Sequence, residues 1–237
     1  MNIQEYEKVK DMDYLEYCDY LQSKYGISTT SYFTKNWSKC SKVTRTAEGL
    51  IVHHKFEDHA IMLGDVKYAR NNPYEWQLPE NLVYCDYLEH LLLHIMICEN
   101  PAADKNKNEF VGIGGVKNHL VPELNDFFSG LEPSKTWQMN CKDRIINDKD
   151  VYFVLLNRFR MNYDGVERNG KRLCKFPSIL LSSATSTSGT WSIKNNIPLF
   201  NEIRNYLESQ KVNDPPSLAE DNNNRFWSQY DIIIGNL

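Results

Sequence analysis

The spacing of apolar residues predicts three helices. The first covers residues 3–25 and is ended by Gly26, the second covers 120–128 and is ended by Gly130, and the third covers 197–207. Apolar residues recur every three or four positions in each, which gives a helix one apolar face. Residues 150–161 are apolar with interspersed arginines and fit a helix or a strand.

Short β-branched runs predict strands between these helices. Residues 50–54 follow a glycine and read Leu-Ile-Val-His-His, and residues 82–84 form a second short run. Residues 176–181 and 231–234 are further strand candidates. The Ser/Thr run at 182–190 and the polar segments around 213–216 and 221–224 predict loops.

A helix is also predicted directly after the second strand. Asp86 suits the N-cap position, and Glu89 three residues later completes a capping box. A leucine-rich helix then extends to about Cys98. The fold class is therefore α+β, with a helical region at 1–44, a compact core at 45–100 and a mixed α/β region at 101–237.

Composition places the chain among globular proteins. It has 237 residues, of which 41% are hydrophobic, so it can bury a core. No apolar run is long enough for a membrane span, and the polar start predicts no signal peptide. Six dispersed cysteines without a C-x-x-C pair favour reduced thiols and a cytoplasmic location.

Five of the six histidines lie between positions 53 and 94. His90 and His94 are four residues apart on the predicted helix, so their imidazoles share one face and form half of a metal site. His53, at the end of the predicted strand, would supply a third nitrogen. Three imidazoles favour a transition ion such as zinc or nickel, and manganese and magnesium remain alternatives.

The neighbouring His54 would then be available for catalysis. Residues next to each other on a strand point to opposite faces, so His54 needs a bend to share the site with His53. A metal that neutralises charge on a phosphate, with His54 as general base, fits phosphodiester hydrolysis. Asn81, in the loop before the second strand, is the candidate orienting partner for this base, because its amide can pin the loop backbone.

These residues resemble the HNH nucleases of the His-Me finger, or ββα-metal, class over residues 45–98. The shared features are the His pair ending a strand, the Pro79–Val83 element, and Glu89-His90 followed by His94. The intervals from Asn81 to His90 and from His90 to His94 are similar to those in colicin-type DNases. The residue types around them are more similar to those of phage-type HNH endonucleases. The interval from His54 to Asn81 is longer than usual, and Lys55–His59 stands where the family has proline and glycines, so we expect an insertion.

The resemblance implies a role for each matching residue. His53, His90 and His94 would be metal ligands, His54 the general base and Asn81 the loop-ordering residue. Two other interpretations stay open. The histidines could form a structural zinc site with Cys85 or Cys98 as the fourth ligand, or they could be unrelated core and surface residues.

Other polar residues near the motif have simpler interpretations. We expect His59 to be solvated within the insertion and His119 to be a surface or cap residue. Glu57 and Asp58 are interpreted as ordinary solvated acids, although they could support the metal or orient His54.

The charge pattern bears on the substrate. The net charge of −4 counts against a non-specific DNA binder. Residues 31–47 nevertheless hold four basic groups and no acid, and 158–175 hold six against two. The candidate nucleic-acid contacts in these segments, which could equally be solvated, are Lys42, Arg45, Arg168, Lys171 and Arg172.

The sequence therefore predicts a metal-dependent endonuclease acting on DNA, in the phage, mobile-element or defence setting that the family suggests. Residues 101–237 would recognise the target or a protein partner. The alternatives are a non-catalytic binding or inhibitory protein on the same scaffold, and an RNase toxin.

Overall fold

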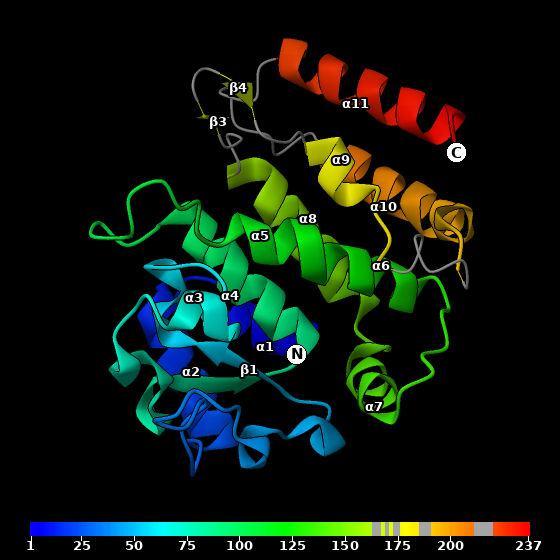
Figure 1. Cartoon of the computed structure of the whole chain (residues 1–237). Coiled ribbons are helices and arrows are strands. Elements are labelled where there is room, and N and C mark those ends of the chain that lie inside the picture. The colour runs from blue at the N-terminus through cyan, green and yellow to red at the C-terminus, as the bar shows by residue number, and fades with distance from the viewer. Residues whose placement is uncertain (163–166, 169–170, 173–175, 185–190, 211–219) are drawn as a thin grey trace. The chain divides into compact units, whose positions relative to one another are not determined.

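The computed structural model describes the backbone of residues 1–162, 167–168, 171–172, 176–184, 191–210 and 220–237, and the side chains of 1–161, 178–184, 191–210 and 227–237. Within these residues the fold is α+β, and helices predominate (Figure 1). The strands of the described residues form two small sheets of two strands each. Contacts divide the chain into two compact units. Unit 1 comprises Met1–Gly114 and Pro133–Val151, and unit 2 comprises Gly115–Glu132 and Tyr152–Leu237.

Unit 1 contains the predicted strand pair and the helix that follows it. β1 (Ile51–His54) pairs antiparallel with β2 (Leu82–Cys85), with His53 opposite Val83 and His54 opposite Leu82. α4 (Tyr87–Glu99) follows, and its capping box joins Asp86 to Glu89 as predicted. The strands, the helix and its N-cap thus confirm the pattern expected over residues 50–98.

The N-terminal helix prediction was wrong in one respect, because residues 3–25 form two helices. α1 (Ile3–Val9) ends before Asp13, and α2 (Tyr14–Tyr25) begins after it. Asp13 and Glu16 form a capping box at the start of α2, each side chain accepting the other's backbone N–H at 2.9 Å. This local cap restarts the helix within a continuous apolar pattern. α2 packs on β2 and α4.

Short helices complete unit 1. Between β1 and β2 lie η3 (Lys55–Asp58), α3 (Val66–Ala69), η4 (Tyr74–Gln77) and η5 (Pro79–Asn81), which form the expected insertion. The others are η1 (Ser41–Val43), η2 (Thr46–Glu48), α7 (Thr136–Ile145) and most of α5 (Ile113–Gly115). Tyr32, Phe33, Val43 and Leu82 form one core cluster of this unit.

Unit 2 is largely helical. Its elements are η6 (Val116–Leu120, a π-helix), α6 (Val121–Phe128), most of α8 (Lys149–Asn162), α9 (Phe176–Leu180), η7 (Ile193–Asn196), α10 (Ile197–Gln210) and α11 (Glu220–Gly235). The strands β3 (Glu167–Arg168) and β4 (Lys171–Arg172) pair with each other. α6 and α10 confirm two predicted helices, and residues 150–161 are helical.

Two strand predictions in unit 2 were wrong. Residues 176–181 contain helix α9, in whose first turn Pro177 is tolerated. Residues 231–234 are the end of helix α11, and residues 221–224 belong to the same helix rather than to a loop. Trp227 and Tyr230 of this helix are buried, and the Tyr230 hydroxyl donates to the Phe200 carbonyl. The expected loops at 213–216 and 185–190 lie outside the described residues.

Among the described residues, no helix combines the length and the apolar character needed to cross a membrane. The expected boundaries at residues 44 and 100 stay a prediction. In the structure, α1, α2, β1, β2 and α4 all belong to unit 1.

Candidate metal centre

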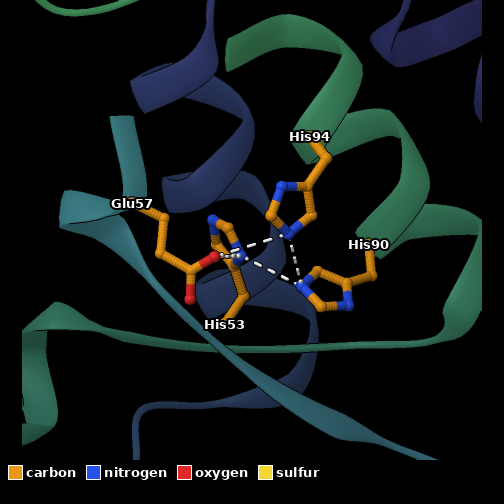
Figure 2. A group of neighbouring side chains, drawn as sticks. All are labelled: His53, Glu57, His90 and His94. Carbon is orange, nitrogen blue, oxygen red and sulfur yellow. Dashed lines mark hydrogen bonds and ion pairs between the residues drawn. The ribbon is translucent and has the colours of Figure 1, made fainter. Parts of the chain in front are cut away.

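Four side chains converge beside β1 (Figure 2). His53 comes from β1, Glu57 from η3, and His90 and His94 from α4. Each offers one potential ligand atom, and the four atoms lie within 4.8 Å of one another. We call these four residues the His/Glu cluster.

Four of the six distances within the His/Glu cluster are close to those around a tetrahedral metal ion. His53 Nδ1 lies 3.2 Å from His90 Nε2, which lies 3.1 Å from His94 Nε2. Glu57 Oε2 lies 3.5 Å from His53 Nδ1 and 3.4 Å from His94 Nε2. Ligands about 2.0–2.2 Å from zinc in a tetrahedron are about 3.3–3.6 Å apart. The residues present therefore fit one divalent ion with three imidazoles and one carboxylate.

The local structure of three segments explains this convergence. β1 ends at His54, and η3 starts with the next residue, so the backbone turns at once and brings Glu57 back toward His53. On α4, the spacing of four residues places His90 and His94 on one face. Pairing of β1 with β2 then sets the distance between His53 and the helix that follows β2.

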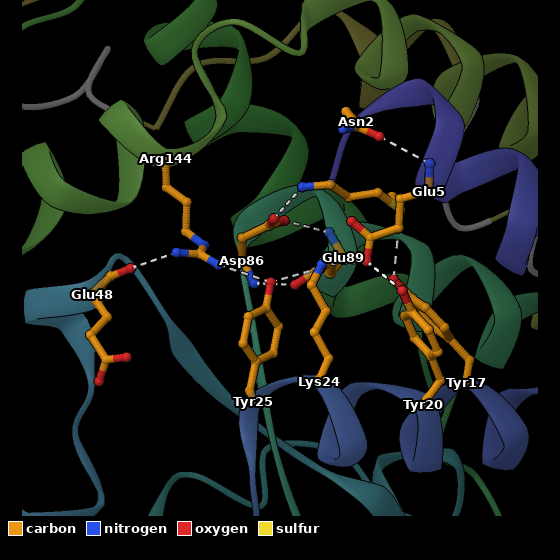
Figure 3. Close-up of polar contacts among 11 residues, drawn as sticks. Asn2, Glu5, Tyr17, Tyr20, Lys24, Tyr25, Glu48, Asp86, Glu89 and Arg144 are labelled. Atoms are coloured by element: carbon orange, nitrogen blue, oxygen red, sulfur yellow. Dashed lines mark hydrogen bonds and ion pairs between the residues drawn. The ribbon is translucent and has the colours of Figure 1, made fainter.

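A polar network contacts the first turn of α4 (Figure 3). His90 lies in this turn. The buried carboxylate of Glu89 accepts hydrogen bonds from Lys24 Nζ at 2.7 Å and from the Tyr25 hydroxyl at 2.9 Å. Asp86 pairs with the N-terminal ammonium group of Met1. Burial, with Asp86 nearby, raises the pKa of Glu89 to about 7. These contacts anchor α4 to α1 and α2.

The His/Glu cluster is largely shielded from solvent. The His53 side chain is fully buried, that of His94 is 8% exposed and that of Glu57 is 16% exposed. Burial lowers the pKa of His53 to about 3, so this imidazole is neutral at neutral pH, as a ligand must be. Burial raises the pKa of Glu57, but His53, His94 and His54 outweigh that effect and hold it well below its usual range.

Tyr14 contacts Nε2 of His53, the ring nitrogen that does not face the cluster. Its hydroxyl lies 2.7 Å from His53 Nε2 and donates to the carbonyl of Lys55 at 3.0 Å. Burial raises the pKa of Tyr14 well above its usual value, so the hydroxyl keeps its single proton. A hydroxyl that donates to the Lys55 carbonyl can accept Nε2–H of His53 with its oxygen. His53 Nδ1 then carries the lone pair, as metal binding requires.

Replacing Tyr14 with phenylalanine is therefore expected to weaken zinc binding about 10- to 100-fold, the usual effect of losing such a supporting contact. The ring, and hence most of the packing, is kept. Competition with a chromophoric chelator measures the affinity. Tyr17→Phe is the matched control, because the buried Tyr17 hydroxyl on the same helix contacts the Met1 sulfur instead. Equal zinc affinity in wild type and Tyr14→Phe would refute this role.

His54 lies next to the His/Glu cluster and is held by other residues. Its Nε2 is 3.1 Å from Gln77 Oε1, and its Nδ1 is 3.5 Å from Glu57 Oε1. Its ring is buried, with its edge against Tyr32. Glu57 therefore contacts both histidines of the pair, Oε2 facing His53 and Oε1 facing His54. His53 and His54 both lie in extended backbone, so the expected bend between them is not seen, and Glu57 reaches both because η3 follows directly after His54.

Asn81 contacts the loop rather than His54. Its amide donates to the carbonyl of Glu75 at 2.8 Å, a bond across the turn from η4 to η5. This contact fits the loop-ordering role that the HNH resemblance implies. The side chain that contacts His54 Nε2 is Gln77, which lies in the loop that Asn81 pins.

The candidate nucleic-acid contacts differ in their surroundings. Lys42 is exposed. The Arg45 guanidinium bonds to Glu48 and to the Tyr25 carbonyl and lies over the Tyr84 ring, so much of it serves the local structure. Arg168 lies in β3, and Lys171 and Arg172 in β4, and their side chains lie outside the described residues.

Glu57 was considered from the sequence as a possible support for the metal, but a solvated acid was the favoured interpretation, whereas the structure places Glu57 in the His/Glu cluster. The available signal was its position four residues after His53, which matters only if the chain turns after β1. Asp58 is buried and bonds to His59 at 2.6 Å, and His59 also contacts Asp104 at 3.1 Å. His59 is thus outside the cluster. His119 is exposed, as expected.

Cysteine does not take part in the metal group found among the described residues, since its members are three histidines and one glutamate. Cys85 is buried, and its Sγ lies 3.9 Å from the Ile51 carbonyl. Cys98 lies against Gly112. The fourth ligand position that the sequence assigned to a cysteine in the structural-zinc alternative is filled by Glu57.

Comparison with known proteins gives no match to a family model, to a curated protein or to a solved structure. The resemblance to HNH nucleases therefore depends on the motif alone.

Proposed function

We propose that this chain is an HNH-type, metal-dependent endonuclease that hydrolyses phosphodiester bonds, with DNA as the expected substrate. The observation that supports this most strongly is the convergence of His53 Nδ1, His90 Nε2, His94 Nε2 and Glu57 Oε2 at distances suited to one divalent ion. The order of the elements, an antiparallel strand pair followed by a helix with two histidines, agrees with a ββα-metal core.

Each residue of the site has a proposed task. His53, His90, His94 and Glu57 would hold zinc, nickel, manganese or magnesium, of which the first two suit imidazole best. When bound, the ion would neutralise charge on the phosphate and stabilise the leaving oxygen. His54 would accept the proton of the attacking water through Nδ1. Asn81 would order the loop beside the site through Glu75.

The Glu57 carboxylate occupies positions that the proposed reaction needs. Its Oε2 fills the fourth position of the cluster, and its Oε1 faces His54 Nδ1. A phosphate oxygen and an attacking water need these two positions. We infer that Glu57 must move aside when substrate binds, and that this one movement uncovers both the ion-binding position and the base.

Cleavage of supercoiled plasmid tests the proposed function directly. The protein is stripped with chelator and then loaded with Zn²⁺, Ni²⁺, Mn²⁺ or Mg²⁺. Nicked and linear DNA should form with at least one metal and should be absent in excess chelator. A parallel assay on RNA separates a DNase from an RNase toxin, since the toxin should cleave RNA and leave the plasmid intact. Absence of cleavage of either nucleic acid with all four metals would contradict the proposal.

A structural metal site in a non-catalytic binding or inhibitory protein is the second candidate. Two observations favour it: Glu57 gives the site four protein ligands, the number typical of structural zinc, and His54 is buried. Binding of dimethyl phosphate to the Co²⁺-loaded protein, followed by the visible spectrum of the ion, separates the two. If the site is structural, dimethyl phosphate should not change the Co²⁺ spectrum of the wild-type protein.

Glu57→Ala is expected to bind dimethyl phosphate about 10- to 100-fold more tightly than wild type in this assay. In the variant, the phosphate has no carboxylate to displace. We take the cost of displacing the Glu57 carboxylate as that of one contact to a charged group, about 1.5–3 kcal/mol, which corresponds to this change in affinity. Asp58→Ala is the matched control, because Asp58 is the adjacent acid and contacts His59 instead. Equal affinity in wild type and Glu57→Ala would show that Glu57 does not occupy the fourth position.

A nucleic acid would also need a basic surface. Lys42, Arg45, Arg168, Lys171 and Arg172 stay the candidates for contacts to the phosphate backbone, and a protein partner for residues 101–237 stays a prediction.

A further inference from the structure

In the described contacts, two side chains from the interval between His54 and Asn81 reach a ring nitrogen of His54: Glu57 faces Nδ1, and Gln77 faces Nε2. Gln77 is fully buried, at the end of η4. Its backbone carbonyl accepts from Tyr32 N–H at 2.8 Å, and Tyr32 in turn packs its ring against His54. Backbone and side chain of Gln77 thus both belong to the environment of this histidine.

The contacts of Gln77 determine the orientation of its amide. Its Nε2 donates to the carbonyl of Leu63 at 3.4 Å. Only the NH₂ end of an amide can bond to a carbonyl oxygen, so Oε1 is the end that faces His54 Nε2 at 3.1 Å. Because Oε1 is an acceptor, a hydrogen on His54 Nε2 completes a hydrogen bond there. The neutral ring then has its lone pair on Nδ1.

The same atom of His54 faces the His/Glu cluster. Nδ1 lies 3.5 Å from Glu57 Oε1, whereas Nε2 points away to Gln77. A general base is effective only if its lone pair faces the reacting water. With the other tautomer, Nδ1–H would face Glu57 Oε1 at 3.5 Å, and the lone pair would face the Gln77 acceptor at the shorter distance of 3.1 Å.

We propose that Gln77 is a positioning residue that fixes the Nε2–H tautomer of His54, so that Nδ1 presents its lone pair to the site. The inference deepens the proposed function and rests on it for the catalytic consequence. Asn81 supports the same arrangement from a distance, because its bond to the Glu75 carbonyl fixes the loop that carries Gln77. The insertion between the two strands thereby supplies the partner of the base.

The test compares Gln77→Met with Gln77→Glu in the zinc-loaded full-length protein. Methionine has a similar shape but no oxygen acceptor, whereas glutamate keeps the acceptor. The ¹⁵N chemical shifts of the His54 ring report which nitrogen carries the proton. We expect Nε2–H in the wild type and in Gln77→Glu, and a mixture of tautomers in Gln77→Met. In the plasmid assay, Gln77→Met should lower kcat about 10²-fold, the lower end of the contribution of a general base, with KM within about twofold.

Gln22→Met is the matched control for loss of a structural amide. Gln22 Nε2 donates to the carbonyls of Glu80 and Leu82 at 2.9 Å and does not contact His54 in the described contacts. It should leave the His54 tautomer and kcat as in wild type. A Nδ1–H tautomer in the wild type, or unchanged tautomers in Gln77→Met, would overturn the proposal. Because the spectra need no turnover, they decide the role of Gln77 even if the wild type cleaves no nucleic acid.

Discussion

Replacing His54 with alanine is expected to lower the rate of plasmid cleavage about 10²- to 10⁴-fold, the range that a general base contributes. His54 is the imidazole beside the His/Glu cluster that is not one of its four members, and its Nδ1 faces Glu57 Oε1. The variant should still bind metal with nearly wild-type affinity, because all four proposed ligands are kept. Rates at saturating DNA and zinc titrations on the same preparations provide the two measurements.

The burial of His54 requires a control for folding in this experiment. Removing a buried ring leaves a cavity, so His54→Gln is made in parallel to preserve most of the volume. His59→Ala tests a nearby histidine that contacts Asp58 and Asp104 and lies outside the cluster. Cleavage by folded, metal-loaded His54→Gln at the wild-type rate would exclude His54 as the base and would leave the His/Glu cluster a structural site.

His94→Ala is expected to weaken zinc binding by more than about 100-fold. Loss of a supporting contact around a metal ligand costs about 10- to 100-fold, and His94 supplies a ligand nitrogen 3.1 Å from that of His90. A 100-fold loss of affinity lowers the stabilisation by saturating zinc by about 2.7 kcal/mol. This corresponds to a Tm about 5–10 °C lower in the presence of zinc.

The comparison is made with and without zinc, so that the packing lost with the ring is measured separately. The difference in Tm between wild type and His94→Ala should be larger in the presence of zinc than in the presence of chelator. His119→Ala provides a control, because His119 is exposed and outside the cluster. If zinc raises the Tm of His94→Ala as much as that of the wild type, His94 is not a ligand.

The sequence predicted the parts of the site that depend on local periodicity. β1, β2 and α4 were predicted because short β-branched runs and a capping box are local signals. The pairing of His90 with His94 follows from helix geometry alone. Placing His53 beside them needed the motif, because the pairing of β1 with β2 joins residues about 30 positions apart.

The remaining features depend on contacts that a single sequence does not display. Glu57 joins the cluster only because η3 reverses the chain after β1, and Gln77 reaches His54 across 23 positions. Both lie in the insertion, for which the motif offers no template. α9 and α11 were predicted in part as strands because four to six apolar residues fit either periodicity, and the surrounding residues decide.

The proposed function depends most directly on a single ion bound among His53, Glu57, His90 and His94. Anomalous diffraction at the zinc edge, from crystals of the zinc-loaded protein, tests it in one measurement. We predict one strong peak about 2.0–2.2 Å from His53 Nδ1, His90 Nε2, His94 Nε2 and Glu57 Oε2. A zinc-saturated protein with no peak among these four atoms, or with its peak elsewhere, would contradict it.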